Sequence, residues 1–248
     1  MSASVATDPS VSPEPPLFQL SGITKSYGRG EARFDALRGI DLAIPRGQFV
    51  AVMGPSGSGK STLMNILGCL DTPTAGEYVF DGQHVERFDS IQRSLLRRHH
   101  HGFIFQGFNL LARTSALENV ELPLLYRGLP RREREALARE ALVSVGLDGK
   151  FRNTPAELSG GQQQRVAIAR AIVTRPLVLF ADEPTGNLDT RTSQDVMALI
   201  TRLNVERGIT VLMVTHEADV AAHAQRIVRV KDGLIDTDSL PMEAAPCC

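Results

Sequence analysis

Short apolar runs separated by polar, glycine-containing turns recur along most of the chain, and this pattern predicts an α/β core. The runs at 48–53, 177–181 and 209–214 are almost entirely apolar, as strands buried on both faces are. Segments with helical spacing follow at 62–67 and at about 191–206. We therefore expect a central sheet with helices on its faces.

The stretch of about 88–160 differs, because it is mainly helical and its clearest amphipathic helix spans 131–146. We expect it to form a subdomain inserted into the α/β core. Within it, 109–128 is a mixed apolar stretch that suggests a surface for a partner. The basic end of 84–101 is expected to be a solvated helix end, since its three adjacent histidines point in different directions and do not make one metal site.

Further strands are expected at 17–20, 23–28, 36–44, 77–80 and 102–106, with a closing hairpin at 226–235.

Composition narrows the class of protein. The 248 residues are 42% hydrophobic and 22% charged, as in ordinary globular domains, and a net charge of -1 gives no case for nucleic-acid binding. No apolar run approaches the length of a membrane span, and the N-terminus does not resemble a secretory signal. Cys69, Cys247 and Cys248 predict no disulfide framework and suit a reducing compartment. We expect disordered tails at 1–16 and 237–248, around an ordered domain at 17–236.

A phosphate-binding loop follows the first buried strand. Its glycines let the backbone approach phosphate closely, and the helix start behind it directs N–H groups at an anion. Lys60 would reach the β- and γ-phosphates, and the Ser61 hydroxyl would bind Mg²⁺. The loop and the helix start comprise Gly54, Pro55, Ser56, Gly57, Ser58, Gly59, Lys60, Ser61 and Thr62.

Four further segments or residues are candidates for nucleotide binding or catalysis, with weaker sequence signals. Ser159, Gly160, Gly161 and Gln162 precede a helix and could form a second anion site shared with another copy, or a plain N-cap. Asp182 and Glu183 end a buried strand, where Asp182 suits Mg²⁺ and Glu183 suits a general base. His216 at a strand end could donate to a γ-phosphate, or be a core residue. Tyr27 could stack on a purine base, or be a packed strand end.

The order of these motifs resembles the ATP-binding subunit of an ABC transporter from about 17 to 236, and the segment 158–162 ahead of the Asp182–Glu183 strand is the most specific part. The resemblance implies a P-loop NTPase core with a mixed sheet, an N-terminal antiparallel β-subdomain and an inserted helical subdomain. It implies that Tyr27 stacks on adenine and that Gln106 senses Mg²⁺ and the attacking water. Asp189 would cross a dimer interface, and His216 would act as a switch. The implied ligands are ATP and Mg²⁺.

Several short sequence segments resemble the macrolide-export and lipoprotein-release group of this family, chiefly 66–71, 105–111, 117–123 and 181–189. This resemblance implies a homodimer at the cytoplasmic face of the membrane that powers a permease, which we expect to be a separate polypeptide, and it allows a periplasmic adaptor. The alternatives are an ABC ATPase that drives a mechanotransmission complex of cell-division type, a DNA-repair or translation ATPase, and a non-enzymatic regulator. The intact Glu183 and His216 argue against the last.

Overall fold

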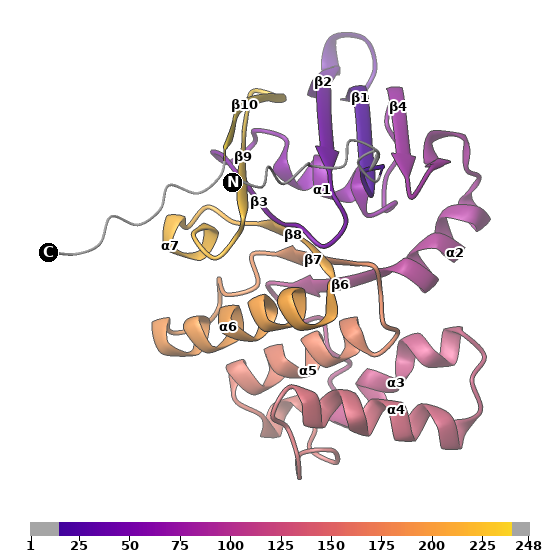
Figure 1. The fold of residues 1–248 in the computed structure, drawn as a ribbon, viewed down its shortest axis with the longest axis vertical. Coiled ribbons are helices and arrows are strands. Elements are labelled where there is room, and N and C mark those ends of the chain that lie inside the picture. The colour runs from indigo at the N-terminus through magenta and orange to yellow at the C-terminus, as the bar shows by residue number, and fades with distance from the viewer. Residues whose placement is uncertain (1–14, 240–248) are drawn as a thin grey trace, which may run out of the picture.

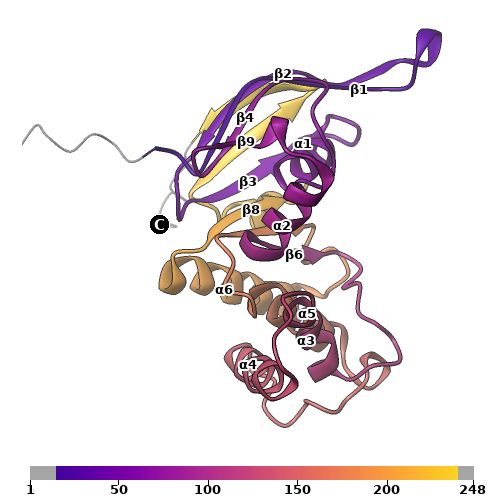
Figure 2. The same cartoon turned by 90° about the vertical axis from the view of Figure 1, so that its right-hand side faces the viewer.

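The structure, a computed structural model, describes residues 15–239, whose strands form two sheets. The smaller sheet is antiparallel and has the order β2-β1-β4-β5. Figure 2 shows the β1–β2 hairpin reaching out beyond the rest of this sheet. Its strands are β1 (Phe18–Tyr27), β2 (Phe34–Ile44), β4 (Ala75–Phe80) and β5 (Gln83–His84).

The larger sheet is mixed and has the order β10-β9-β3-β8-β7-β6. All its neighbours pair in parallel except the hairpin of β9 and β10. The segments that follow β3, β6, β7 and β8 therefore emerge at one edge of the sheet, where ligands of open α/β sheets bind. Its strands are β3 (Phe49–Met53), β6 (His101–Phe105), β7 (Val178–Asp182), β8 (Thr210–Val214), β9 (Arg226–Lys231) and β10 (Leu234–Ser239).

Seven α-helices surround the sheets within residues 15–239, together with three short 3-10 helices at 30–32, 85–87 and 155–157. Figure 1 places α1 beside the antiparallel sheet and α3, α4, α5 and α6 at the opposite end of the molecule. No helix in this described part combines the length and apolarity needed to cross a membrane. The helices are α1 (Lys60–Leu67), α2 (Ser90–His100), α3 (Ala116–Tyr126), α4 (Arg131–Ser144), α5 (Gly160–Ile172), α6 (Thr190–Arg207) and α7 (Ala218–Ala221).

The large sheet has a hydrophobic core on each face. Because side chains alternate along a strand, β3 sends Val50 and Val52 into one core and Ala51 and Met53 into the other. The first core joins the sheet to α1 and the antiparallel strands, and the second joins it to α3, α4, α5 and α6. This two-sided burial explains why the strand runs contain almost no polar residues.

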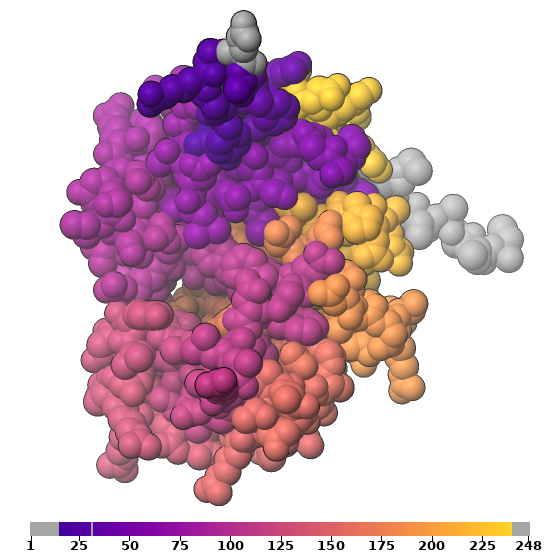
Figure 3. Space-filling view, turned by 180° about the vertical axis from the view of Figure 1, so that it is seen from behind, coloured from indigo at the N-terminus to yellow at the C-terminus, as the bar shows by residue number. Residues whose placement is uncertain are grey.

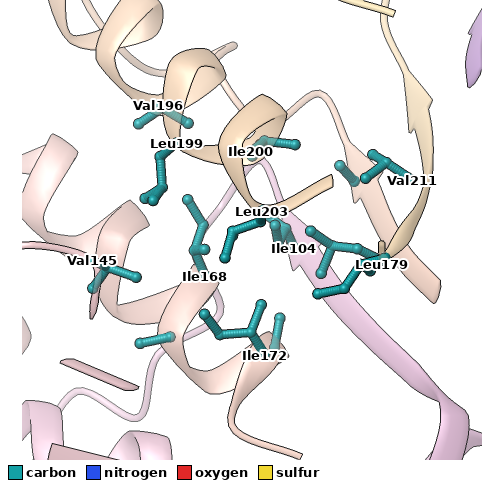
Figure 4. Close-up of a cluster of buried hydrophobic side chains, with 14 of the residues drawn as sticks. Ile104, Val145, Ile168, Ile172, Leu179, Val196, Leu199, Ile200, Leu203 and Val211 are labelled. Carbon is teal, nitrogen blue, oxygen red and sulfur yellow. The ribbon is translucent and has the colours of Figure 1, made fainter. Parts of the chain in front are cut away.

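Figure 4 shows the second core, where α5 and α6 pack on the sheet. Ile168 and Ile172 on α5 and Leu203 on α6 point toward Leu179 of β7 and Ile104 of β6. All five side chains are at most 4% exposed. At about 25 cal/mol per Å² of apolar area removed from water, such side chains supply much of the free energy that holds the helices on the sheet.

The structure differs from the predicted subdomain boundary of 88–160. That range includes α2 and β6, and β6 is the edge strand of the main sheet. The helices that pack against one another to form the helical subdomain are α3, α4 and α5. The strand itself was expected at 102–106, but sequence periodicity does not say which strands it pairs with.

The predicted tails lie largely outside the described residues, as do Cys247 and Cys248. At the C-terminal boundary, however, β10 continues to Ser239 instead of ending at 236. Arg226 holds this end, donating to both carboxylate oxygens of Asp238 at 2.7 and 2.6 Å. The last four residues of this edge strand, 236–239, are all polar, so no apolar pattern predicted a strand there.

The prediction of a solvated histidine run is wrong for His101. His101 begins β6, is 5% exposed, and lies against the rings of Phe80, Phe103 and Phe180 at centroid distances of 5.0 to 6.2 Å. Burial lowers the pKa of its imidazole to about 3. His99 and His100 end α2 at the surface or partly exposed, so only the third histidine enters the core.

Candidate functional site

The phosphate-binding loop lies between β3 and α1, and two of its glycines are required by the backbone. Gly54 has φ of 151°, and a Cβ there would lie 2.0 Å from the Val230 carbonyl oxygen. Gly59 has φ of 106°, and its Cβ would lie 2.6 Å from the Ala36 carbonyl oxygen. No side chain fits at either position, so the loop can wrap tightly only with glycine there.

Lys60, the first residue of α1, folds back over this loop. Its Nζ donates to the carbonyl oxygens of Gly54 and Pro55, at 2.8 Å each. The Ser58 hydroxyl is buried, and the described residues offer it no hydrogen-bond partner. The loop thus holds a positive charge in its concave face, as a site for an anion requires.

Asp182 and Glu183 lie at the end of β7, between the ends of β6 and β8. Glu183 has φ of 43°, a left-handed conformation that is strained for a residue with a side chain, and its N–H donates to the Val214 carbonyl oxygen. Burial and the neighbouring Glu183 raise the pKa of Asp182, while the Lys60 ammonium acts in the opposite direction. Two carboxyl groups and one lysine therefore share this edge of the sheet.

His216 follows β8 and lies against Glu183. Its Nδ1 is 2.9 Å from Oε1 of Glu183, and which atom carries the proton depends on the tautomer. The imidazole is 62% exposed and the Glu183 side chain 26% exposed. Both groups are thus accessible to a ligand at this edge.

Gln106 follows β6 and packs against the loop behind Glu183. Its carbonyl oxygen accepts a hydrogen bond from Nδ2 of Asn187 at 3.0 Å. A Cβ on Gly186 would lie 2.6 Å from Nε2 of Gln106, so glycine is needed for the amide to lie there. The structure thus brings Lys60, Gln106, Asp182, Glu183 and His216 to one edge of the sheet.

Tyr27 ends β1 and presents a ring that is 40% exposed. Its hydroxyl donates to Oδ2 of Asp71 at 2.8 Å, and Nζ of Lys25 lies 4.9 Å from the ring centroid. Neither contact was predicted from the sequence. Asp71 is 44 residues from Tyr27 in the chain, so no local pattern links them.

The Ser159–Gln162 motif forms the N-terminus of α5 as a capping box. The Ser159 hydroxyl accepts from the Gln162 N–H at 3.3 Å, and the Gln162 side-chain oxygen accepts from the Ser159 N–H at 3.1 Å. A Cβ on Gly161 would lie 2.3 Å from Cγ2 of Thr192, so this end of α5 packs closely on α6. The plain N-cap role is therefore present, and the exposed Ser159 leaves room for a further contact.

The structure does not bring this motif to the phosphate loop of the same chain. α1 contributes to the core on one face of the large sheet and α5 to the core on the other. Figures 1 and 2 both show the two helices in different halves of the molecule. Asp189 is the N-cap of α6, where it accepts hydrogen bonds from the N–H and hydroxyl of Thr192 at 3.0 and 2.7 Å.

One further functional candidate was missed, the guanidinium of Arg170 on α5. It donates to the carbonyl oxygens of Phe108, at 2.8 Å, and Asn109. Both residues have left-handed φ values, 59° and 50°. Arg170 thus holds a strained loop directly behind Gln106, and no local sequence signal predicts a contact across about 60 residues.

Comparison with known proteins agrees with this geometry. A family model described as "ABC transporter" matches residues 37–186. The "Macrolide export ATP-binding/permease protein MacB" of Syntrophobacter fumaroxidans is 53% identical over 225 residues, which are 90% of this chain and 32% of MacB. The "Uncharacterized ABC transporter ATP-binding protein YknY" of Bacillus subtilis is 52% identical over 219 residues, which are 88% of this chain and 95% of YknY. The chain thus spans about a third of the MacB relatives and nearly all of YknY.

A solved structure gives the same result for the fold. The ATP-binding cassette MJ0796, in a dimeric post-hydrolysis state bound to ADP and Pi, has a TM-score of 0.83 and 44% identity, and covers 91% of this chain and 99% of its own. A further structure of MJ0796 is also dimeric. The phosphate loop, the carboxylate pair at the end of β7 and this likeness agree, and the chain belongs to the ABC transporter family as an ATP-binding cassette.

Proposed function

We propose that two copies of this chain close head to tail around two ATP molecules and so drive a membrane permease. The observation that carries this proposal is the separation of the two anion-binding segments. Within one chain, α1 with the phosphate loop and α5 with Ser159–Gln162 contribute to cores on opposite faces of the sheet. A second copy related by a two-fold axis can supply the missing segment, which makes the two sites equivalent. The dimeric state of MJ0796 supports the association of two copies.

Each residue at the strand ends then has a role in hydrolysis. Lys60 exchanges its two carbonyl partners for oxygens of the β- and γ-phosphates. Glu183 accepts a proton from the attacking water, and His216 turns from Glu183 to the γ-phosphate. The partner copy contacts the same γ-phosphate or its surroundings through Ser159, Gly160, Gly161, Gln162 and Asp189. Hydrolysis removes the group that both copies bind, so the closed state loses its advantage.

Mg²⁺ fits the residues at this edge, and Ser61, Gln106 and Asp182 would hold it. Burial and the adjacent Glu183 raise the pKa of Asp182, so a cation beside it would offset the cost of its negative charge. Residues 15–239 contain no cluster of three or more His, Cys, Asp or Glu residues that could hold a metal by itself. This suits Mg²⁺, which takes few protein carboxylates and completes its shell with water and phosphate oxygens. When bound, the ion neutralises charge on the phosphates.

The groove between α2, β6, α3 and α5 is the place where we propose that a permease segment docks. It is a mostly apolar cavity of about 680 Å³, lined by Phe103, Phe105 and three residues of α3, Leu122, Pro123 and Tyr126. Figure 3 shows the surface hollowed between the magenta part that holds α2 and the pink part below it. The groove adjoins Gln106 through β6 and the strained loop at 108–109. Movement at the ATP site can therefore reach a bound permease segment directly.

The direction of transport follows only from relatives. MacB is named for macrolide export, and we propose an export or lipoprotein-release role for this chain at the cytoplasmic face of the inner membrane. A periplasmic adaptor would be a further component of the same assembly.

The test is the oligomeric state of Glu183→Gln by light scattering, with and without MgATP. The expected result is an ATP-dependent dimer with no turnover, because the amide keeps the shape of Glu183 but cannot accept the proton. Glu206→Gln on the exposed side of α6 is the matched control and should behave as the wild type. Normal hydrolysis by Glu183→Gln would disprove the role of Glu183 as base. A variant that binds ATP and stays monomeric would contradict the shared site.

A further inference from the structure

The ring of Tyr27 is anchored at two points by a small polar network. Its hydroxyl donates to Oδ2 of Asp71, and the Lys25 ammonium lies over the ring. The same ammonium donates to Oδ1 of Asp71 at 2.6 Å and to the Thr72 carbonyl oxygen at 2.7 Å. Both oxygens of Asp71 are thus engaged, one by Lys25 and one by Tyr27.

Asp71 is itself fixed to the phosphate-binding half of the site. It lies in the turn after α1, where its N–H donates to the Asn65 carbonyl oxygen at 3.1 Å. Thr62, on the first turn of α1, is near enough to the Tyr27 phenol to affect its pKa. The aromatic ring at the end of β1 is therefore tied to the helix whose N-terminus faces phosphate.

The charges in this network are stable at neutral pH. Burial acts to raise the pKa of Asp71, but hydrogen bonds from Lys25 and Tyr27 outweigh it and hold the pKa below its ordinary value. Burial and the hydrogen bond to Asp71 raise the pKa of Tyr27, and Thr62 acts against them. A lysine only 9% exposed requires such a partner, because an unpaired buried charge is costly.

The network is more than the fold needs at this position. Tyr27 is 40% exposed, so water could satisfy its hydroxyl if solvation were all that it required. Lys25 occupies one face of the ring, which leaves the other face for a ligand. A planar base stacks well on an aromatic ring whose orientation is fixed in advance, because less side-chain freedom is lost on binding.

We propose that Asp71 and Lys25 are positioning residues that hold Tyr27 as a one-sided platform for the base of ATP. This inference rests on the proposed function, in which Tyr27 receives the base. Asp71 and Lys25 act through the ring and do not contact the phosphates. Their removal should therefore weaken the binding of a nucleotide but not the binding of its phosphate chain alone.

The test compares MgATP with magnesium tripolyphosphate, which lacks base and ribose, by titration calorimetry on the full chain. The variants are Tyr27→Phe, Asp71→Asn and the double variant, and the control is Asp81→Asn, which removes an exposed ion pair to Arg46 in the same subdomain. We expect Tyr27→Phe and Asp71→Asn each to raise the Kd for ATP about 3- to 10-fold, with the tripolyphosphate Kd unchanged. Because both changes act on the same contact between Tyr27 and Asp71, the Kd of the double variant for ATP should exceed that of the weaker-binding single variant by no more than about 2-fold.

Two outcomes would overturn the inference, and Tyr27→Ala separates them from a failure of the proposed function. If Tyr27→Ala weakens ATP binding while Tyr27→Phe and Asp71→Asn do not, the ring is used but Asp71 does not position it. If Asp71→Asn weakens ATP and tripolyphosphate equally, its role is to stabilise the turn after α1. If Tyr27→Ala itself leaves ATP binding unchanged, the base does not lie on Tyr27, and the proposed nucleotide site is wrong at that point.

Discussion

The Nδ1 atom of His216 lies 2.9 Å from Oε1 of Glu183, although the two residues follow different strands and are 33 positions apart. Parallel pairing of β7 with β8 brings the strand ends together and thereby sets this contact. The left-handed backbone of Glu183 turns the chain directly after Asp182. In the proposed mechanism, His216 must leave this contact when the γ-phosphate arrives.

The first prediction is that Glu183 and His216 act as a unit. Glu183→Gln and His216→Ala should each lower the kcat for ATP hydrolysis about 100- to 10,000-fold, the range for loss of a general base or its partner. The double variant should lose little more than the worse single variant, because residues that act together are not additive. Phosphate release measures this, and His223→Ala, an exposed histidine near α7, is the control. Additive losses would show that the two residues act independently.

Much of the fold was predictable because the sheet is buried on both faces. The runs that became β3, β7 and β8 carry apolar side chains at successive positions, and their ends were expected within one or two residues. α3 was not expected as a helix, because Pro123 lies inside it. The capping box of Ser115 and Glu118 was the signal that could have identified its start.

The candidate site was predictable only where its chemistry is local in sequence. The phosphate loop is contiguous, so spacing alone identifies it. The contact of His216 with Glu183 and the network of Lys25, Tyr27 and Asp71 depend on strand pairing and on the turn after α1, which periodicity does not encode. The placement of His101 was wrong for the same reason, since its burial depends on contacts with Phe80 and Phe180, which lie far from it in the chain.

The second prediction concerns the free energy of unfolding that the ionised Asp182 side chain costs in the chain without ligand. Burial and Glu183 raise the pKa of Asp182, so its protonated form is favoured by folding. That favourable contribution is complete below the pKa of the unfolded chain and is lost as pH rises through the higher pKa of the folded chain. Asp182→Asn should therefore raise the Tm of the ligand-free protein by a few degrees at pH 7, and the gain should shrink toward pH 4.

The measurement is thermal unfolding across that pH range, with and without MgATP. The wild type should gain stability from MgATP, and Asp182→Asn should gain much less, because it has lost the carboxylate that we propose for Mg²⁺. Asp236→Asn, an exposed change on β10, serves as the control. An Asp182→Asn protein that is less stable at pH 7 than the wild type would contradict the electrostatic argument.

The third prediction concerns acid sensitivity caused by His101. Its folded-state pKa of about 3 lies far below the ordinary value, so protonation favours the unfolded chain. Stability is unaffected above about pH 6.5 and is lost progressively as pH falls toward 3, at up to about 1.4 kcal/mol per pH unit. His101→Phe fits among the rings of Phe80, Phe103 and Phe180 and should flatten this loss. Denaturant unfolding between pH 7 and pH 4 measures the slope, which His223→Ala should leave unchanged.

The fourth prediction separates the structural role of Gly161 from its proposed role in nucleotide binding. A Cβ on Gly161 would lie 2.3 Å from Cγ2 of Thr192, and this methyl group cannot easily move, because the Thr192 hydroxyl is bound to Asp189. Gly161→Ala should therefore lower the Tm by pushing α5 away from α6. Thr192→Ser removes the methyl group and keeps the hydroxyl, and the nearest remaining Thr192 atom would lie 3.7 Å from the new Cβ. The double variant should recover the Tm of Thr192→Ser alone.

Recovery of stability should not bring recovery of function. If Gly161 also contacts ATP held by a second copy, its new methyl group blocks a close approach that only glycine permits. We expect the double variant to bind ATP as a monomer, yet to form no ATP-dependent dimer in the Glu183→Gln background and to hydrolyse ATP at least about 10-fold more slowly than Thr192→Ser, since one lost transition-state contact costs that much or more. Light scattering and phosphate release on the same samples measure both properties. Full recovery of dimer and turnover would mean that Gly161 serves only the packing of α5 on α6, and that the shared site does not use it.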